Sequence, residues 1–285
     1  MRTGSRRWVV AVGAALVALG AQGIAAAPAH AAPAPGTAEV IGGDLFFTAG
    51  PGVDNRVEFF FTKGDLRWHV VDTAAAIVPG AGCAPVTASH VKCAGVLTIF
   101  ADTKDGDDTL GVREAIPASQ PAGLRLAAPT NPVASERPRM TILGGPGDDK
   151  LTGGWGDDVL DGGPGADVMT DWAGADTVTY ADRTVRVVAD PDGVVSDDGE
   201  YGEGDTIGTS VENLIGGAGP DILTGSGGTN LLFGGAGPDR LSGLDGADQL
   251  FGDAGLDLLS GGAATDMCYL GPDGAKVVDC EGVGP

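Results

Sequence analysis

Basic residues are scarce in this 285-residue sequence, and several functional motifs are missing. Only 17 Lys and Arg stand against 39 Asp and Glu, so the formal net charge is −22. A chain this acidic repels phosphate, which excludes duplex nucleic acid as a partner. The sequence has neither an H-E-x-x-H zinc-protease helix nor a G-x-S-x-G nucleophile elbow, so we expect no enzymatic activity. No stretch after residue 31 is long and apolar enough for a stable membrane span.

Glycine is abundant, and its distribution excludes two fold classes. Helix bundles fit poorly with 50 Gly, because each one costs about 1 kcal/mol relative to Ala in a helix. The Gly residues have no three-residue period, which excludes collagen. A hydrophobic content of 42% can bury a core, which excludes disorder throughout. The composition therefore favours an acidic, all-β protein of one or two domains.

Residues 1–31 have the pattern of a secretory signal peptide. Three Arg precede the uncharged apolar stretch Trp8–Ala27, and an A-x-A site follows at Ala29-His30-Ala31. An N-terminal membrane anchor is the alternative. The pair Arg6-Arg7 resembles a twin-arginine export signal, but that route would fold the chain in a cytosol poor in calcium and oxidant. We therefore expect the general secretory route and an extracellular location.

Cysteine is limited to four residues, which form two local pairs, Cys83/Cys93 and Cys268/Cys280. An even count in an exported chain favours two disulfides. A zinc site is the alternative, although no Cys lies in a C-x-x-C pair. After signal removal only His69 and His90 remain, and they are isolated in sequence, so we expect them to be structural.

Charge and glycine are unevenly distributed along the chain. Residues 32–140 hold 9 basic and 12 acidic residues, whereas residues 141–285 hold 5 basic and 27 acidic residues and 34 of the 50 Gly. The first region should form a small β domain or a β cap, with a linker or long loop at Ala115–Pro138. Its strand-like runs are Val57–Thr62, Leu66–Val71 and Val96–Phe100.

A nine-residue repeat dominates the second region. Three units follow one another from Gly144, and a decayed fourth unit spans Asp171–Thr179. A second block of six units spans residues 216–269. Over the ten units Asp fills nine of the sixth positions, Gly fills nine of the fourth positions, and an apolar residue fills every eighth position. A weaker half-unit, Asp105–Leu110, lies upstream and out of register.

One repeat unit cannot bury itself, because it has only one dependable apolar residue. Stacked units can, since their eighth side chains then form a continuous inner stripe. The Gly-rich positions allow tight turns, and positions seven to nine are β-prone. Two turns and two short strands complete a coil in 18 residues. The same turn therefore recurs at i+18, one strand spacing of roughly 4.8 Å away.

This stacking brings carboxylates together. Two unit charges at that distance repel by roughly 1 kcal/mol in water and more in a less polar site. A divalent cation between turns would replace this repulsion with attraction, because it binds both carboxylates. Calcium is favoured because it accepts six to eight oxygens in flexible geometry, whereas magnesium needs tight octahedra and zinc prefers Cys or His. The predicted calcium ligands are Asp149, Asp158, Asp167, Asp176, Asp221, Asp239, Asp248, Asp257 and Asp266.

The units resemble the G-G-x-G-x-D-x-U-x repeat of the RTX, or haemolysin-type calcium-binding, family over residues 144–179 and 216–269. The resemblance implies a parallel β-roll with calcium between successive turns, held by sixth-position Asp side chains and turn carbonyls. Three departures are local. Asn230 lacks the charge, Asp171-Trp172 replaces the Gly pair of the fourth unit, and Ala263-Ala264 should flatten the last turn.

Two segments break the period. Residues 180–215 form an acidic insertion with a strand expected at Val185–Ala189, and its acidic stretch Asp190–Asp205 is expected to be a solvated loop, with an irregular cation site as the alternative. Residues 270–285 should form a C-terminal cap.

Taken together, the patterns predict a secreted, non-enzymatic protein that folds on binding calcium. Two alternatives stay open. One is adhesion to a cell surface or an extracellular glycan through residues 32–140. The other is a polysaccharide-active β-solenoid enzyme.

Overall fold

The computed structural model describes residues 32–62, 65–113 and 137–284. The predicted signal peptide at 1–31 and nearly all of the predicted linker at 115–138 lie outside these residues. Every regular element in the described ranges is a β-strand. None of the described segments forms a helix able to cross a membrane. The protein is therefore all-β, as its composition predicts.

The strands form three sheets that make the walls of a β-roll. The first sheet supplies one wall, and the other two supply the opposite wall in succession. The first sheet contains, in order, β26 (Gly282–Gly284), β24 (Met267–Tyr269), β22 (Gln249–Phe251), β20 (Leu231–Phe233), β18 (Asn213–Ile215), β14 (Thr177–Thr179), β12 (Val159–Asp161), β10 (Arg139–Leu143), β8 (Thr98–Asp102), β2 (Asp44–Thr48), β1 (Gly36–Ile41) and β5 (Ile77–Pro79). The second contains β17 (Thr206–Ile207), β13 (Val168–Thr170), β11 (Lys150–Thr152), β9 (Thr109–Val112), β3 (Arg56–Thr62), β4 (Arg67–Asp72), β7 (His90–Cys93) and β6 (Cys83–Thr87). The third contains β16 (Gly199–Glu200), β15 (Val187–Ala189), β19 (Ile222–Thr224), β21 (Arg240–Asp245), β23 (Asp257–Ala263) and β25 (Ala275–Val278).

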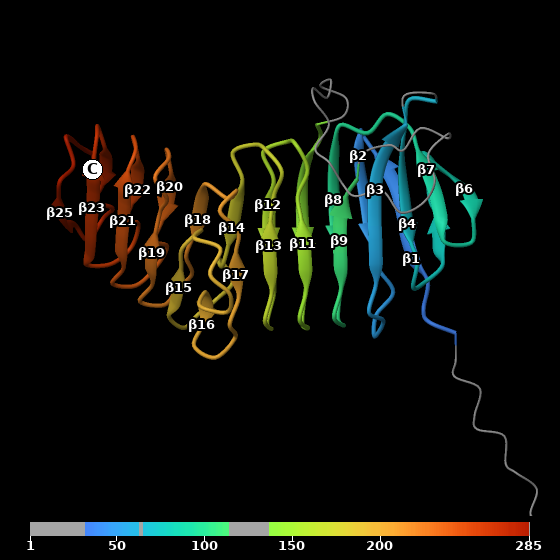
Figure 1. The fold of residues 1–285 in the computed structure, drawn as a ribbon, viewed down its shortest axis with the longest axis horizontal. Helices are drawn as coiled ribbons and strands as arrows, with labels where there is room; N and C mark the ends of the chain where they lie inside the picture. The colour runs from blue at the N-terminus through green and yellow to red at the C-terminus, as the bar shows by residue number, and fades with distance from the viewer. Residues whose placement is uncertain (1–31, 63–64, 114–136, 285) are drawn as a thin grey trace, which may run out of the picture. The chain divides into compact units, whose positions relative to one another are not determined.

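Successive coils within the repeat blocks pair in parallel at 18-residue intervals. Leu151 lies beside Met169 between β11 and β13, and Leu223 lies beside Leu241 between β19 and β21. Figure 1 shows these short strands standing side by side along the roll within residues 137–284. The predicted coil of two strands and two turns is therefore confirmed.

The core is the predicted stripe of eighth-position side chains. All of them are at most 2% exposed, because each points between the two walls. They are Leu151, Leu160, Met169, Val178, Leu223, Leu232, Leu241, Leu250, Leu259 and Cys268.

Residues 36–112 build the first coils of the same roll. In one wall β2 pairs in parallel with β8, and β8 pairs with β10; in the other β3 pairs with β9, and β9 pairs with β11. Antiparallel strands β4, β7 and β6 extend the second wall beyond β3. Large aromatics fill this end, including Phe47, Phe59 and Trp68. The expected β cap is thus continuous with the repeats.

The two predicted disulfides are present. Cys83 on β6 is bonded to Cys93 on β7, and Cys268 on β24 is bonded to Cys280, which lies between β25 and β26. Strands β25 and β26 pair with β23 and β24, so residues 275–284 extend both walls. The expectation that Ala263-Ala264 flattens the last repeat turn is wrong, since Ala264 keeps a positive φ of 95°.

The segment 180–215 also completes coils. Strand β17 pairs with β13, β18 pairs with β14, and β15 pairs with β19. The second sheet ends at β17 and the third begins with the antiparallel pair β16 and β15. The insertion is therefore the place where one wall passes from one sheet to the next.

Candidate metal centre

The nine predicted calcium ligands lie in the turns that join the walls or, for Asp257, at the first residue of strand β23, and they form ladders along the roll. In five of them the backbone N–H donates to Oδ1 of the Asp one coil later. The N···Oδ1 distances are 2.8 Å for Asp149 to Asp167, Asp158 to Asp176 and Asp221 to Asp239, 3.0 Å for Asp239 to Asp257, and 2.9 Å for Asp248 to Asp266. All five predicted stacked pairs are therefore adjacent in the fold.

The second carboxylate oxygens of these residues are buried and mostly unsatisfied. Asp158 and Asp221 are the exceptions, because both of their oxygens accept backbone N–H groups. Each of the others has an Oδ2 that accepts no hydrogen bond from the described residues: Asp149, Asp167, Asp176, Asp239, Asp248, Asp257 and Asp266. Their residues are at most 3% exposed. An unpaired carboxylate in such a position is costly, so these oxygens are suited to a cation.

The first-position glycines make room for those oxygens. A Cβ atom on Gly162 would lie 2.2 Å from Oδ2 of Asp167, and one on Gly234 would lie 2.6 Å from Oδ2 of Asp239. Carbonyl oxygens of the neighbouring coil crowd the same turn, since a Cβ on Gly163 would lie 2.0 Å from the Gly145 oxygen. The turns thus gather carboxylate and carbonyl oxygens, which are the hard donors that calcium prefers. The residues present fit that ion.

Burial governs the protonation of the ladder. Desolvation raises the pKa of Asp149 and Asp239 to about 7, that of Asp167 to about 8 and that of Asp248 to about 6, and neighbouring carboxylates add to each shift. Without a cation the ladder therefore holds protons near neutral pH. A divalent ion would compete with those protons.

One ladder extends beyond the recognised units to Asp108. The Asp108 N–H donates to Oδ1 of Asp149 at 2.7 Å, and the Asn55 N–H donates to Oδ1 of Asp108. Asp108 is 1% exposed, and its Oδ2 has no partner among the described residues. Lys104 and Gly106 keep the positive φ of the second and fourth repeat positions. In the sequence only the half-unit Asp105–Leu110 indicates this turn. Because Asp108 and Asp149 are 41 residues apart, the half-unit does not fall in the nine-residue register.

Asp171 is a second site residue that the repeat pattern does not identify. It replaces the first-position glycine of the fourth unit, and oxygens of Asp158, Asp171 and Asp176 lie within 4.8 Å of one another. All three side chains are buried. No other group of three such ligands gathers in this way in the described ranges.

The acidic insertion does not behave as a solvated loop at its two deepest carboxylates. Asp198 is 3% exposed and Asp205 is fully buried. Asp198 accepts N–H groups from Asp190 and Ile207. Asp205 continues one ladder by accepting the Asp167 N–H at 2.9 Å, and its other oxygen accepts the Tyr180 hydroxyl. The solvated-loop prediction is wrong for these two residues, and the alternative of an irregular cation site in the insertion stays a prediction.

Arg183 gives this junction a cation of its own. The guanidinium is only 6% exposed, donates to the Gly163 carbonyl and pairs with the Asp182 carboxylate.

Glu212 and Glu281 continue the other ladders by accepting the N–H groups of Asp176 and Asp266 at 2.9 and 2.8 Å. Neither Glu belongs to a nine-residue unit, so the period gives no sign of their roles.

Asn230 keeps its place in the ladder without a charge. Its N–H donates to Oδ1 of Asp248 at 2.8 Å, and its Oδ1 accepts the Ser226 N–H at 2.7 Å. Its side-chain amide donates to the Glu212 carbonyl at 2.7 Å. The amide accepts hydrogen bonds from protein groups and donates hydrogen bonds to them, whereas seven of the nine Asp at this position retain an unpaired oxygen. Because Asn230 lacks the charge of Asp, we predict weaker calcium binding at this turn.

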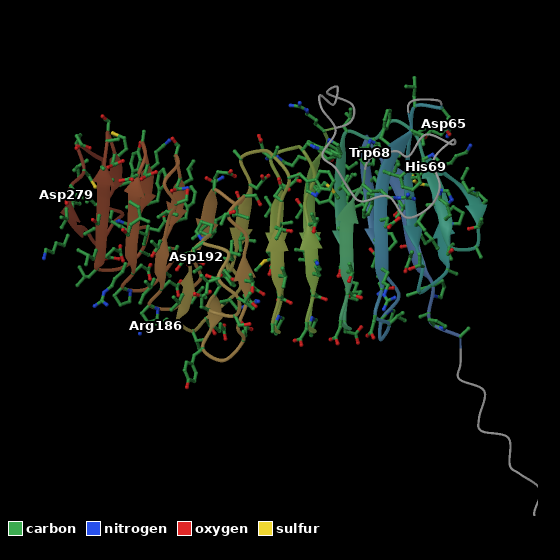
Figure 2. The ribbon with its side chains drawn as sticks, viewed as in Figure 1. Asp65, Trp68, His69, Arg186, Asp192 and Asp279 are labelled. Atoms are coloured by element: carbon green, nitrogen blue, oxygen red, sulfur yellow. A yellow bond between two sulfur atoms is a disulfide. The ribbon has the colours of Figure 1, made fainter. Side chains whose placement is uncertain are left out.

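The two histidines that are isolated in sequence lie together at the N-terminal end of the roll. Nδ1 of His69 lies 2.8 Å from Nε2 of His90, and Phe60 stacks on His69 with ring centroids 4.8 Å apart. Figure 2 shows His69 near Asp65, whose carboxylate is 3.7 Å from Nε2. Burial lowers the pKa of both histidines. Antiparallel pairing of β4 with β7 brings them together, which the sequence does not reveal.

The comparisons with known proteins agree with this geometry. The model of the RTX calcium-binding nonapeptide repeat matches four times, at residues 141–169, 161–180, 206–241 and 242–273. A search of curated proteins found no match to the chain. The matched residues include all nine predicted ligands and Asp171, whereas Asp108 and Asp198 lie outside. Residues 141–180 and 206–273 of this chain therefore carry RTX calcium-binding nonapeptide repeats, which support a calcium-binding β-roll protein.

Proposed function

We propose that this protein is secreted and that its β-roll folds when it binds extracellular calcium, in a non-enzymatic structural or interaction role. The observation that carries the proposal is the set of seven sixth-position Asp whose Oδ2 is buried without a hydrogen-bond donor among the described residues. Ionised carboxylates in such surroundings oppose folding. A bound divalent cation removes the penalty and links the coils, so binding and folding become one event.

The extracellular location is supported by the leader-like residues 1–31 and by the two disulfides, which persist in oxidising compartments. Extracellular calcium modules work at about 10⁻⁴ to 10⁻³ M, which suits sites that must fill only after export. A cytosol poor in calcium would leave the chain unfolded and ready to cross the membrane. Detection of the mature chain in culture medium, beginning near residue 32, tests this part.

The non-enzymatic role is supported by how the acidic residues are used. Asp198 and Asp205, the two buried acids of the insertion, use both of their carboxylate oxygens to accept hydrogen bonds from protein donors. Carboxylates held in this way do not resemble the pair of free acids that a glycosidase needs. Turnover of an acidic polysaccharide by the calcium-loaded protein would contradict this part of the proposal.

Circular dichroism tests the coupling of folding to calcium. The β signal of the purified chain should appear on adding calcium at pH 8 and disappear on adding a calcium chelator. Magnesium at the same concentration should restore little of it, because its octahedral demand and slow dehydration fit these turns poorly. A β signal that is unchanged by chelation would contradict the proposal.

A further inference from the structure

The turn around Asp171 differs from every other turn of the repeat blocks. Nine of the ten units have Gly at the first position, and the fourth unit has Asp171 instead. Elsewhere this position lies against Oδ2 of the sixth-position Asp, as with Gly162 and Asp167. A side chain here must therefore share its space with a carboxylate.

The Asp171 side chain points at the carboxylates of two coils. A Cβ atom on Gly153 would lie 2.0 Å from Oδ1 of Asp171 and 2.8 Å from Oδ2 of Asp158, so both oxygens border one small volume. Asp176 completes the group, because one oxygen from each of the three residues lies within 4.8 Å of the other two. The three residues come from the second and fourth units, whose strands β12 and β14 pair side by side in one wall.

The backbone holds the three carboxylates in place and leaves two oxygens free. Oδ2 of Asp171 accepts the Ala173 N–H at 2.8 Å, and the Asp171 N–H donates to the Ser210 hydroxyl at 3.0 Å. Oδ1 of Asp176 accepts the Asp158 N–H at 2.8 Å. Oδ1 of Asp171 and Oδ2 of Asp176 have no partner in the described residues. Asp171 is 9% exposed and Asp176 is fully buried, so these two oxygens are shielded from bulk solvent.

No basic side chain neutralises this group. The ion pairs of the described residues leave all three carboxylates without Lys or Arg, and the nearest such pair in sequence joins Arg139 to the exposed Asp157. Three formal negative charges in a buried volume need a compact, multivalent counter-charge. The nearby Arg183 guanidinium is directed elsewhere, since it donates to the Gly163 carbonyl and pairs with Asp182.

We propose that Asp158, Asp171 and Asp176 form a three-carboxylate calcium site that binds more tightly than the two-carboxylate turns of the roll and fills first. The inference rests on the proposed calcium function. Calcium affinity rises with the number of carboxylate ligands, and this site has one carboxylate more than its neighbours. Asp171 is thus a ligand gained at a position where the repeat normally needs glycine.

Two tryptophans provide a local signal for occupancy. Trp155 and Trp172 lie next to Gly154 and Asp171 in the chain, and their rings meet edge to face at 5.0 Å. Terbium, an oxygen-seeking trivalent substitute for calcium, emits when a nearby tryptophan is excited. Titration of the full mature chain with terbium should therefore give strong tryptophan-sensitised emission with the first equivalent. Calcium should displace it.

The decisive variants are Asp171→Gly and Asp171→Asn. The first restores the residue that the other nine units carry, so the turn should fold, which circular dichroism in saturating calcium checks. The second keeps the acceptor for Ala173 and removes the charge. Each should weaken the tightest class of calcium sites by at least about tenfold in a chelator-competition titration and abolish most of the first-equivalent terbium emission. Asp192→Asn, which removes the same charge from an exposed position, should change neither.

Three outcomes separate the possibilities. If the unaltered chain binds calcium and both variants bind the first ion with unchanged affinity, the three-carboxylate site is overturned while the calcium function stands. If Asp171→Asn stabilises the chain and calcium binding is unaffected, a shared proton joins Asp171 and Asp176, which also overturns the site. If the unaltered chain binds no calcium, both the site and the proposed function fail.

Discussion

The two ends of the roll use the same walls but different means of stabilising them. Residues 36–112 bury Phe47, Phe59 and Trp68 and carry the Cys83–Cys93 disulfide. Residues 141–269 bury one medium-sized side chain per unit and place unpaired carboxylate oxygens in their turns. A coil with a large apolar core can fold without a cation, whereas a coil with a thin core and buried charge cannot. The comparison indicates that calcium dependence is a property of the repeats more than of the roll.

The largest expected effect is a regional loss of protection when calcium is removed. On chelation at pH 8, amides of β11–β14 and β19–β24 should exchange hydrogen at least about 100-fold faster, whereas amides of β2, β3, β4 and β7 should change much less, because the aromatic cluster there needs no metal. Hydrogen-exchange mass spectrometry measures both regions in one sample. Equal loss across residues 36–112 and 141–269 would break the comparison and make the roll one cooperative unit.

The next effect is a pH dependence of the metal-free protein. Burial raises the pKa of Asp149 and Asp239 from 3.8 to about 7 and that of Asp167 to about 8. Between the ordinary pKa and these raised values, the folded chain therefore binds more protons than the unfolded chain. The free energy of unfolding therefore falls as pH rises from about 4 to about 8, by several kcal/mol over the whole ladder, and is highest at the acidic end.

Without calcium, Tm should accordingly be higher at pH 4.5 than at pH 8, and the increase in Tm that calcium gives should grow as pH rises. Differential scanning calorimetry with and without chelator measures both quantities. A metal-free Tm that rises between pH 4.5 and pH 8 would contradict the buried-carboxylate account.

The smallest effect separates glycines that face a carboxylate from those that do not. Gly162→Ala places Cβ 2.2 Å from Oδ2 of Asp167 and should lower the free energy of unfolding in calcium by about 1–3 kcal/mol. Gly227→Ala is the matched control in another repeat, because nothing lies within 4 Å of its Cβ and its φ is not positive, so its effect should stay within about 0.5 kcal/mol. Chemical denaturation in saturating calcium gives both values. Equal losses would mean that first-position glycine serves the turn backbone and not the carboxylate.

A regular period predicted much of the candidate site. The nine Asp, their i+18 neighbours and the Leu stripe follow from spacing alone, because each coil repeats the hydrogen-bonding of the one before it. The repeat pattern indicates Asp108 only in part. Thr103 stands where a unit has its first glycine, and 41 residues separate Asp108 from Asp149 in the next turn of the ladder. The sequence shows Asp171 as a departure from the repeat pattern. It does not show where the side chain points, because a side chain at that position meets carboxylates from another coil.

The all-β class, the 18-residue coil, the buried stripe and the chemistry of the turns follow from the residue pattern, because they depend on contacts at a fixed interval along the chain. The three-dimensional fold was needed to show that residues 36–112 continue the same walls, that Asp198 and Asp205 are buried, that Arg183 reaches the Gly163 carbonyl and that His69 meets His90. Those contacts join residues at irregular separations. Their partners are set by how the coils stack and by how loops of unequal length close, and no local pattern of residue types records either.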